Sequence, residues 1–394
     1  MARQLRGART LPQAEAFPSP VDMHVDTGSR HEGPEAGTAL CLSGGGYRAM
    51  LFHVGSLWRL YDAGLLSGID RISSVSGGSI TAAVLGLNWR HLSFDADRVQ
   101  ADFVPRVVEP VRTLARKTID VGSVLRGLVL PGRISQKVAN SYDKVLFKGA
   151  TLQDLPDRPR FVINATNLQS GALWRFMKPY MRDYKVGEVK SPRLRLADAV
   201  AASSAFPPVL SPMELKLDPA AFTADTGDGL QQPPFTERVI LSDGGVYDNL
   251  GLETAWKRYL TILVSDAGGT LDADGRPRTD WALQSVRVLF VIDNQVRSLR
   301  KRSLIDAYIH KRRDGAYWGI GTDIDDYGLA DAWDCPFERT QELAKVSTRL
   351  KRTPEALQER LINWGFAVTD AAIRRHLDPE LGRPAALPYP ATGI

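Results

Sequence analysis

The stretch LCLSGGGYRAMLFHVG, residues 40–55, places three consecutive glycines between an apolar run and an amphipathic one. The apolar run, residues 38–43, is short and bounded by glycines, which is typical of a buried parallel strand. From Tyr47 to Tyr61 the apolar residues recur at spacings of three and four, which indicates one face of a helix. The quoted stretch therefore predicts a strand, a glycine turn and a helix.

A second small-residue cluster, ISSVSGGSITAAVLG, follows at residues 72–86. Its pattern predicts a strand over residues 71–75 and a helix over residues 77–87. The two strands and the helix between them make a βαβ unit, whose crossover is almost always right-handed and makes the strands parallel. Both clusters then lie at the carboxyl edge of the sheet, where open α/β sheets place their sites.

Ser76 lies directly between the second strand and its helix. A serine at such a turn needs small residues two positions to either side, so that the backbones do not clash. Gly78 meets this need, and Ser74 is small although it replaces the usual glycine. The turn, with Gly77 after the serine, exposes the hydroxyl near a helix N-terminus, whose free N–H groups favour developing negative charge. Ser76 is therefore a candidate nucleophile.

The glycine loop supplies the complement to this serine. Without side chains, the amides of Gly44, Gly45 and Gly46 can approach a ligand closely and form an anion-binding concavity. Opposite a nucleophilic serine, that concavity is an oxyanion hole, and Arg48 would order the loop or add positive potential. Either cluster alone also fits a plain tight connection. Their pairing on successive strands favours catalysis.

The glycine loop has one serious rival interpretation. GGGYRA at residues 44–49 satisfies the G-x-G-x-x-A pattern of dinucleotide-binding folds. That pattern needs an acidic residue at the end of the second strand to bind the ribose. This strand ends in Val75 and Ser76, Asp70 precedes it at the wrong end, and no GK[ST] follows the loop. A nucleotide-binding module therefore remains only an alternative, beside a catalytically silent regulator of the same fold.

A serine hydroxyl needs a proton acceptor to become a competent nucleophile. None of the six histidines follows a predicted strand in a site-like setting, and His53 is expected to be a packing residue. A desolvated carboxylate within hydrogen-bond reach can accept the proton directly, although it can also serve as a helix N-cap. Asp243 is favoured because Gly244 and Gly245 let another loop approach it. The residues alone leave three strand-ending candidates open: Asp243, Asp266 and Asp293.

Three motifs, taken in order, resemble those of the patatin-like phospholipase family. They are GGGYR at residues 44–48, SVSGG at residues 74–78 and DGG at residues 243–245. ADAVAASSAFPP, at residues 197–208, is similar to the small-residue segment that the family carries between its serine and its aspartate. The resemblance covers residues 38–265.

The resemblance implies a three-layer α/β sandwich, with a mainly parallel central sheet flanked by helices as in α/β-hydrolases. It implies a Ser-Asp dyad without histidine, in which Ser76 is the nucleophile and Asp243 the proton acceptor. It assigns the oxyanion hole to the backbone of Gly44, Gly45 and Gly46, with Arg48 beside it. The supporting motif residues are Ser74, Gly77, Gly78, Gly244 and Gly245.

The resemblance also implies a substrate class. Family members act on acyl esters of lipids, usually phospholipids, so a phospholipase A or lysophospholipase without metal or organic cofactor is expected. Ser74 and Ala49 stand where the family often has glycine. Both are small, and neither change affects the dyad.

The composition of the 394 residues is that of a globular protein, with 43% hydrophobic residues. The net charge of +5 is too small to indicate nucleic acid, although it is compatible with an anionic membrane surface. The two cysteines, Cys41 and Cys335, form neither a CxxC pair nor a histidine cluster, so no disulfide framework or zinc site is expected. The first residues lack the apolar core of a secretory signal, and no long apolar run suggests a spanning helix. A cytoplasmic protein, with peripheral membrane contact, is expected.

The chain is expected to divide into three parts. These are a flexible leader at residues 1–36, the catalytic domain at residues 38–265 and a mostly helical C-terminal extension at residues 266–394, packed on the same core. Residues 95–150 are predicted to form amphipathic helices, either in the core or as a lid or wall of an acyl pocket. A last strand is predicted at residues 286–292.

A transient contact with a membrane surface is expected, and the basic segment at residues 297–313 is either its site or a solvated helix face. On an anionic leaflet each basic residue near the surface adds about 1 kcal/mol. Glutamate at Arg300, Lys301 and Arg302 should therefore weaken binding to anionic vesicles. Three tryptophans are either buried or interfacial anchors: Trp174, Trp318 and Trp364.

Overall fold

The computed structural model describes residues 34–119 and 133–394, apart from residues 270, 272 and 278. Residues 1–33 of the predicted leader, and residues 120–132 of the predicted helical region, lie outside the described part of the chain. The first strand begins at Glu35, before the predicted start at Thr38.

The strands form one 11-stranded mixed sheet in the order β11-β10-β1-β2-β3-β4-β5-β6-β8, and β9 pairs with both β3 and β7. The sheet is parallel from β11 to β3 and antiparallel beyond β3. The strands are β1 Glu35–Leu42, β2 Arg71–Ser74, β3 Arg160–Asn167, β4 Leu173–Phe176, β5 Tyr180–Asp183, β6 Gly187–Lys190, β7 Met213–Lys216, β8 Phe222–Thr223, β9 Arg238–Asp243, β10 Tyr259–Asp266 and β11 Asp314–Gly319.

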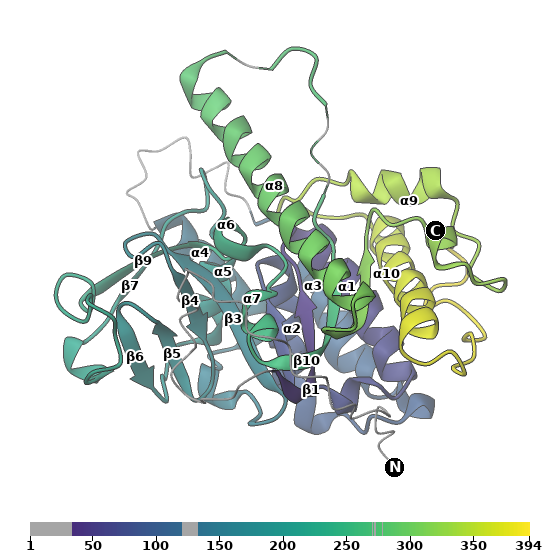
Figure 1. Cartoon of the computed structure of the whole chain (residues 1–394), viewed down its shortest axis with the longest axis horizontal. Helices are drawn as coiled ribbons and strands as arrows, with labels where there is room; N and C mark the ends of the chain where they lie inside the picture. Colours follow the sequence, from purple (N-terminus) through teal and green to yellow (C-terminus); the bar gives the residue numbers. More distant parts are fainter. Residues whose placement is uncertain (1–33, 120–132, 270, 272, 278) are drawn as a thin grey trace.

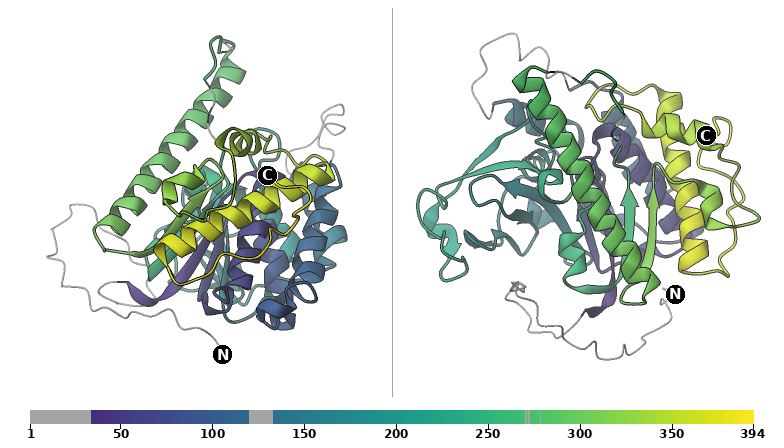
Figure 2. Two further views of the ribbon diagram at one scale, coloured as in Figure 1. Left: turned by 90° about the vertical axis from the view of Figure 1, so that its right-hand side faces the viewer. Right: turned by 45° about the horizontal axis from the view of Figure 1, so that its top comes forward.

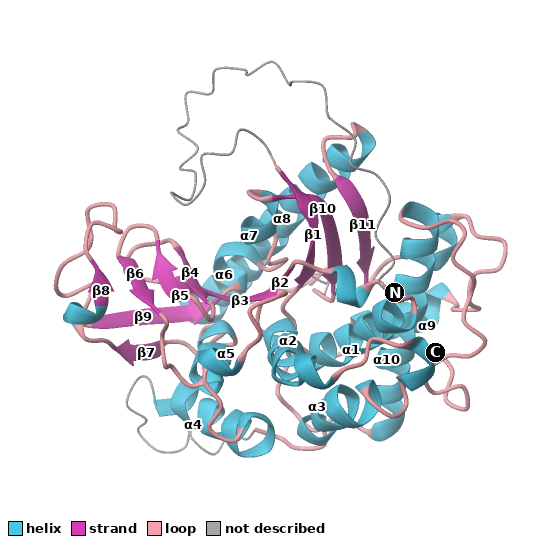
Figure 3. Ribbon diagram, turned by 90° about the horizontal axis from the view of Figure 1, so that it is seen from below, coloured by secondary structure: helices cyan, strands magenta, loops and turns pink. Residues whose placement is uncertain are grey.

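Helices cover both faces of the parallel part of the sheet. Figure 3 shows α6, α7 and α8 on one face, and α1, α2, α3 and α10 on the other. The predicted three-layer α/β sandwich is therefore confirmed. The helices are α1 Gly46–Asp62, α2 Gly77–Asn88, α3 Glu109–Ala115, α4 Arg133–Tyr142, α5 Leu196–Ser203, α6 Gly245–Asp248, α7 Glu253–Trp256, α8 Trp281–Ile309, α9 Phe337–Ala344 and α10 Glu355–His376.

The βαβ unit predicted from the two glycine clusters is confirmed. β1 and β2 are parallel neighbours, with Cys41 opposite Ser73. Successive side chains of a strand point to opposite faces, so β1 contributes to both layers. Ala39 and Cys41 pack in the hydrophobic cluster that includes Leu304 of α8. Leu40 and Leu42 pack in the cluster that includes residues of α1.

The prediction of a strand at residues 286–292 is wrong, because these residues lie in the helix α8. The run VRVLFVI is rich in β-branched residues and lacks a helical period, so its pattern favours a strand. It forms a helix because it belongs to the crossover between two parallel neighbours, β10 and β11, and such crossovers are usually helical. Sequence analysis also missed β11, whose sequence DGAYWG contains few strand-forming residues.

The C-terminal helix α10 packs along α1. The two backbones approach closely at two glycines. A Cβ on Gly55 would lie 1.9 Å from the carbonyl oxygen of Ile362, and a Cβ on Gly365 would lie 2.0 Å from that of Phe52. Residues near the C-terminus therefore share a core with the β1–α1 unit.

The predicted amphipathic region contributes to the same core. Val107, Val108, Val111 and Leu114 are fully buried. These side chains pack as core residues and do not form a lid. The three tryptophans considered as interfacial anchors are also fully buried: Trp174, Trp318 and Trp364.

Candidate active site

Ser76 forms the predicted tight turn between β2 and α2. It is the N-cap of α2, and its φ of 51° is a left-handed conformation that side-chain-bearing residues rarely adopt. The turn also brings backbones together, because a Cβ on Gly77 would lie 2.2 Å from the carbonyl oxygen of Gly46 and one on Gly78 would lie 2.4 Å from that of Leu42. Backbone strain of this kind is often stored at functional sites.

A chain of serine hydroxyls supports this turn. The backbone N–H of Ser76 donates to Oγ of Ser203 at 3.0 Å, and Ser203 is hydrogen-bonded to Ser79 at 2.9 Å. Ser79 donates to Oγ of Ser74 at 3.0 Å, and Ser74 donates to the carbonyl of Val162 at 3.2 Å. The serine at position 74 is thus accommodated by hydrogen bonds of its own. Sequence analysis missed Ser203 and Ser79, although Ser203 lies in the small-residue segment 197–208.

Asp243 lies at the same height in the sheet as Ser76, because both strands are paired to β3. β2 is parallel to β3 and ends with Ser74 opposite Ile163. β9 is antiparallel to β3 and ends with Asp243 opposite Ala165. β4 occupies the other side of β3 at these positions, so β2 and β9 lie on one side with their carboxyl ends facing each other. Two residues beyond Ser74, the chain reaches Ser76 beside Asp243.

The Asp243 carboxylate is almost completely buried. Its Oδ1 accepts a hydrogen bond from the N–H of Gly245 at 2.7 Å. Burial raises the pKa of Asp243 to about 7, hydrogen bonds from Gly245 and the Ser76 side chain lower it, and the charge of Asp293 raises it. A carboxylate with this pKa is a much better proton acceptor at neutral pH than an exposed aspartate.

Asn249 connects the aspartate loop to the glycine loop, and sequence analysis missed it. Its carbonyl oxygen accepts the N–H of Gly44 at 3.0 Å. Its side chain lies against both loops, since Oδ1 would be 2.3 Å from a Cβ on Gly44 and 2.9 Å from one on Gly245. The backbone at Gly244 is also close to β3, because a Cβ on Gly244 would lie 2.5 Å from the carbonyl oxygen of Asn164.

The glycine loop leads directly into α1. Gly45 is the N-cap and Gly46 the first residue of this helix. Amides at a helix start have no partner within the helix, so those of Gly45 and Gly46 can bind an anion, whereas the Gly44 amide is occupied by Asn249. Gly46 has a φ of 58°, and a Cβ there would lie 2.0 Å from the carbonyl oxygen of Thr348.

Arg48 is buried beside this loop, and its guanidinium binds backbone carbonyls. It donates to the carbonyl oxygens of Ala344 at 2.9 Å, Val346 at 2.8 Å and Ala267 at 2.9 Å. Of the two roles considered for Arg48, these contacts favour ordering of the loop. They also tie the loop to residues near the C-terminus.

The other candidate proton acceptors are placed differently. Asp266 ends β10 and accepts hydrogen bonds from Tyr317 Oη at 2.8 Å and from the N–H of Gly268 at 2.8 Å. Asp293 does not end a strand, because it lies in α8. His53 is a packing residue: its ring bonds Ser265 and the Ser43 carbonyl, and burial lowers its pKa to about 4.

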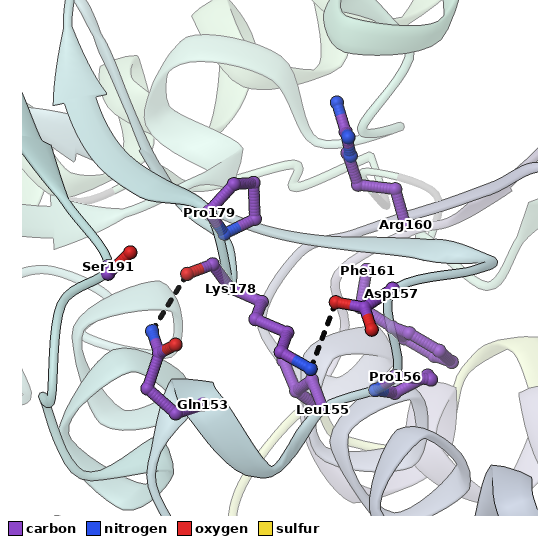
Figure 4. Close-up of a pocket in the computed structure, with 9 residues that line it drawn as sticks. All are labelled: Gln153, Leu155, Pro156, Asp157, Arg160, Phe161, Lys178, Pro179 and Ser191. Atoms are coloured by element: carbon purple, nitrogen blue, oxygen red, sulfur yellow. Dashed lines mark hydrogen bonds and ion pairs between the residues drawn. The ribbon is translucent and has the colours of Figure 1, made fainter.

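A surface pocket lies at the opposite end of the strands (Figure 4). Arg160, at the start of β3, and Phe161 line it, together with Gln153, Asp157 and Lys178. Lys178 and Asp157 form an ion pair at 3.0 Å, and Gln153 donates to the Lys178 carbonyl at 2.8 Å. The pocket contains none of the predicted site residues. In the described part of the chain, no group of three or more His, Cys, Asp or Glu side chains is arranged to hold a metal ion.

The family model of the patatin-like phospholipases matches residues 40–256, which is more than half of the chain. The chain therefore belongs to the patatin-like phospholipase family, as the three motifs predicted. The matched segment contains both glycine clusters and Asp243. No curated protein gives a significant match.

Two solved structures similar to this chain are those of a human phospholipase and of a bacterial protein. Human GIVD cytosolic phospholipase A2, in complex with methyl γ-linolenyl fluorophosphonate, is similar over 86% of this chain and 57% of its own, with 15% identity and a TM-score of 0.48. VipD from Legionella pneumophila is similar over 85% of this chain and 66% of its own, with 16% identity and a TM-score of 0.35. This chain thus spans less than two thirds of the length of either protein.

Proposed function

We propose that this protein hydrolyses fatty-acyl esters of phospholipids or lysophospholipids, with Ser76 as nucleophile and Asp243 as general base. The observation that carries the proposal is the pairing of β2 and β9 on one side of β3, which brings the carboxyl ends of the two strands together. Membership in the patatin-like phospholipase family supports the substrate class.

In the proposed first step, the Ser76 hydroxyl loses its proton to Asp243 while its oxygen attacks the ester carbonyl carbon. The oxyanion that forms is bound by the amides of Gly45 and Gly46 at the start of α1. The intermediate collapses, the C–O bond to the alcohol breaks, and Asp243 returns the proton to the leaving alcohol. An acyl-enzyme on Ser76 remains.

In the proposed second step, water replaces the alcohol. Asp243 accepts a proton from the water as it attacks the acyl-enzyme, and the same two amides bind the second oxyanion. Collapse breaks the bond between the acyl carbon and the Ser76 oxygen, Asp243 returns its proton to that oxygen, and the fatty acid leaves. Arg48 takes no part in proton transfer here; it positions the Gly45–Gly46 loop through the three carbonyls that it binds.

The test is fluorophosphonate labelling with mass-spectrometric mapping of the modified residue, beside fatty-acid release from mixed phospholipid vesicles. We expect label on Ser76 and release of fatty acid. Ser76→Ala should abolish both while thermal unfolding changes little, because the Ser203 contact uses the backbone N–H of residue 76.

Three other outcomes would contradict the proposal. Label on a different residue would move the nucleophile elsewhere. An unlabelled, inactive and folded wild-type protein would be a silent regulator. Saturable binding of NAD or ATP that Gly45→Val abolishes, without hydrolysis, would favour the nucleotide-binding alternative.

A further inference from the structure

α8 starts beyond the rim of the sheet that carries Ser76 and runs back along the sheet. It connects the parallel neighbours β10 and β11, and Ser265 near the end of β10 lies level with Leu42 and Ser74. A 29-residue helix is about 43 Å long, whereas the 8-residue strand β10 spans about 26 Å. The N-terminal part of α8 therefore projects beyond the sheet, as Figures 1 and 2 show.

The projecting part, residues 281–292, is here named the α8 tip. Arg287 is its only charged residue. The large apolar side chains exposed on it are Trp281, Leu283, Val288, Leu289, Phe290, Val291 and Ile292. Five of these are consecutive, so they point to every side of the helix. A helix that is apolar on all sides is normally covered by protein or lipid.

The rest of α8 is held firmly on the sheet. Leu304 is fully buried, and Tyr308 Oη donates to the carbonyl of Ile262 at 2.6 Å. Arg300 forms ion pairs with Glu253 at 3.0 Å and Asp248 at 3.6 Å. The tip is therefore the exposed end of a fixed helix.

The tip also packs next to the candidate active site. The ring of Phe290 stacks on that of Phe206, with centroids 5.7 Å apart. The residue before Phe206, Ala205, accepts the backbone N–H of Asp243 at 2.9 Å. One position beyond the tip, Asp293 contributes to the raised pKa of Asp243. An object that covers the tip would therefore adjoin the rim where Ser76 and Asp243 meet.

The distribution of side chains distinguishes two possible occupants. A second copy of α8 would pack against one apolar stripe and leave the opposite side polar. The consecutive apolar residues 288–292 have no polar side. Immersion in a lipid layer covers all sides at once, and Trp281, 83% exposed at the far end, is a residue type enriched at membrane–water interfaces.

We propose that the α8 tip inserts into the surface of a phospholipid layer and so holds the Ser76 rim against it. Insertion at the surface is also the geometry that α8 permits, because no helix in the described residues is long and apolar enough to cross a bilayer. Binding itself does not depend on the proposed function; only the benefit to catalysis rests on it.

The proposed contact differs from the electrostatic contact predicted for residues 297–313. Arg300 is engaged by two carboxylates, and the ammonium of Lys301 lies 4.5 Å from the ring centroid of Tyr317. Charge reversal at these two positions would disturb the part of α8 that is fixed on the sheet. Substitution within the tip avoids this problem.

The binding test uses Ser76→Ala protein, which leaves the vesicles intact, and sedimentation with vesicles of phosphatidylcholine. The tip variant replaces Val288, Leu289, Val291 and Ile292 by Gln and keeps Phe290 with its contact to Phe206. We expect the partition coefficient to fall about tenfold or more, because transfer of apolar side chains drives insertion. Binding should change little between low salt and about 0.5 M salt, since the tip carries one charge.

The matched control lies on the same helix. Leu299 and Ile309 are 50% and 69% exposed, and their replacement by Gln makes the same chemical change outside the tip. This variant should bind within about twofold of the parent, as expected for surface substitutions. Equal loss in the tip variant and the control, or no loss in either, would overturn the proposal.

A second measurement separates this proposal from the proposed function. With Ser76 present, the tip variant should hydrolyse a short-chain ester in solution within about twofold of wild type, while its hydrolysis of vesicle phospholipid falls with binding. If wild type hydrolyses neither substrate, the proposed function fails, and vesicle binding still tests the tip. A dimer that the tip substitutions dissociate, together with no vesicle binding, would make the tip a self-association surface and refute insertion.

Discussion

In the proposed mechanism, the buried carboxylate of Asp243 has a task that requires it to be ionised. Its pKa is raised to about 7, chiefly by burial. The ionised form must accept the serine proton, yet burial disfavours that form. Activity and stability therefore have opposite pH dependences at this one residue.

The first prediction concerns the acid limb of the pH–rate profile. Below about pH 7, kcat/KM for a soluble ester should fall about tenfold per pH unit, because only the ionised fraction of Asp243 can act as base. A profile measured from pH 5 to 9 checks this. An acid limb near pH 4, where an ordinary aspartate titrates, would contradict a base with this raised pKa.

The same pKa makes a prediction for stability. A carboxyl whose pKa is higher in the folded state binds more protons when folded, so its contribution to stability is lost as pH rises from about 4 to about 7. At about 1.4 kcal/mol per pKa unit, ionised Asp243 costs the fold up to about 4 kcal/mol. Asp243→Asn should thus be inactive but more stable than wild type at pH 8, with an advantage that shrinks towards pH 4 in urea unfolding.

At the scale of elements, Arg48 in the first turn of α1 ties the glycine loop to two other segments of the chain. Three carbonyl oxygens from two separate segments converge on its guanidinium. We predict that Arg48→Met leaves these carbonyls unpaired, lowers the free energy of unfolding by about 3 kcal/mol and reduces kcat, as the Gly45–Gly46 amides lose their support. Chemical denaturation and kinetics on a soluble ester measure both effects.

Arg48→Lys serves as the control for that prediction. It keeps the charge but offers no rigid fork of donors, so an intermediate loss is expected. Unchanged stability in Arg48→Met, with activity lost only on phosphate-bearing substrates, would instead assign Arg48 to the positive potential of the site.

The success of sequence analysis also varied by element. The β1–α1–β2–α2 unit was predictable because its residues switch from a strand pattern to a helical period at the glycines. α8 was not, because VRVLFVI has the local preference of a strand and becomes helical only through the crossover that it belongs to. Ser203 and Asn249 were missed for a related reason: their contacts to Ser76 and Gly44 are tertiary, and their local sequence carries no sign of them.

At the scale of the whole molecule, the C-terminal part of the chain completes the candidate site. The family match ends at residue 256, yet Arg48 and Gly46 contact the backbone of residues 344–348, and α10 packs on α1. We therefore propose that residues 266–394 fold together with the catalytic part and cannot be removed from it.

The prediction at this scale uses the close contact of α1 and α10. Gly365→Val should force the helices apart, since any Cβ there lies 2.0 Å from the carbonyl oxygen of Phe52. We expect a loss of about 3 kcal/mol or more in the free energy of unfolding and lower soluble yield. Gly382→Ala is the control, because a Cβ there meets nothing within 4 Å. Equal stability of the two variants would mean that α10 is not part of the same cooperative unit.

The pairing of β2 and β9 with the same strand, β3, determines which parts of the protein can change between homologues. The separation of Ser76 and Asp243 depends on which residues of β3 their strands bond, at Ile163 and Ala165, and not on the length of chain between them. The strands β5, β6 and β8 belong to the chain between Ser76 and Asp243, but they lie beyond β4 in the sheet. Homologues could therefore lengthen or delete these strands, and alter the outline of the protein, while Ser76 and Asp243 keep their relative position.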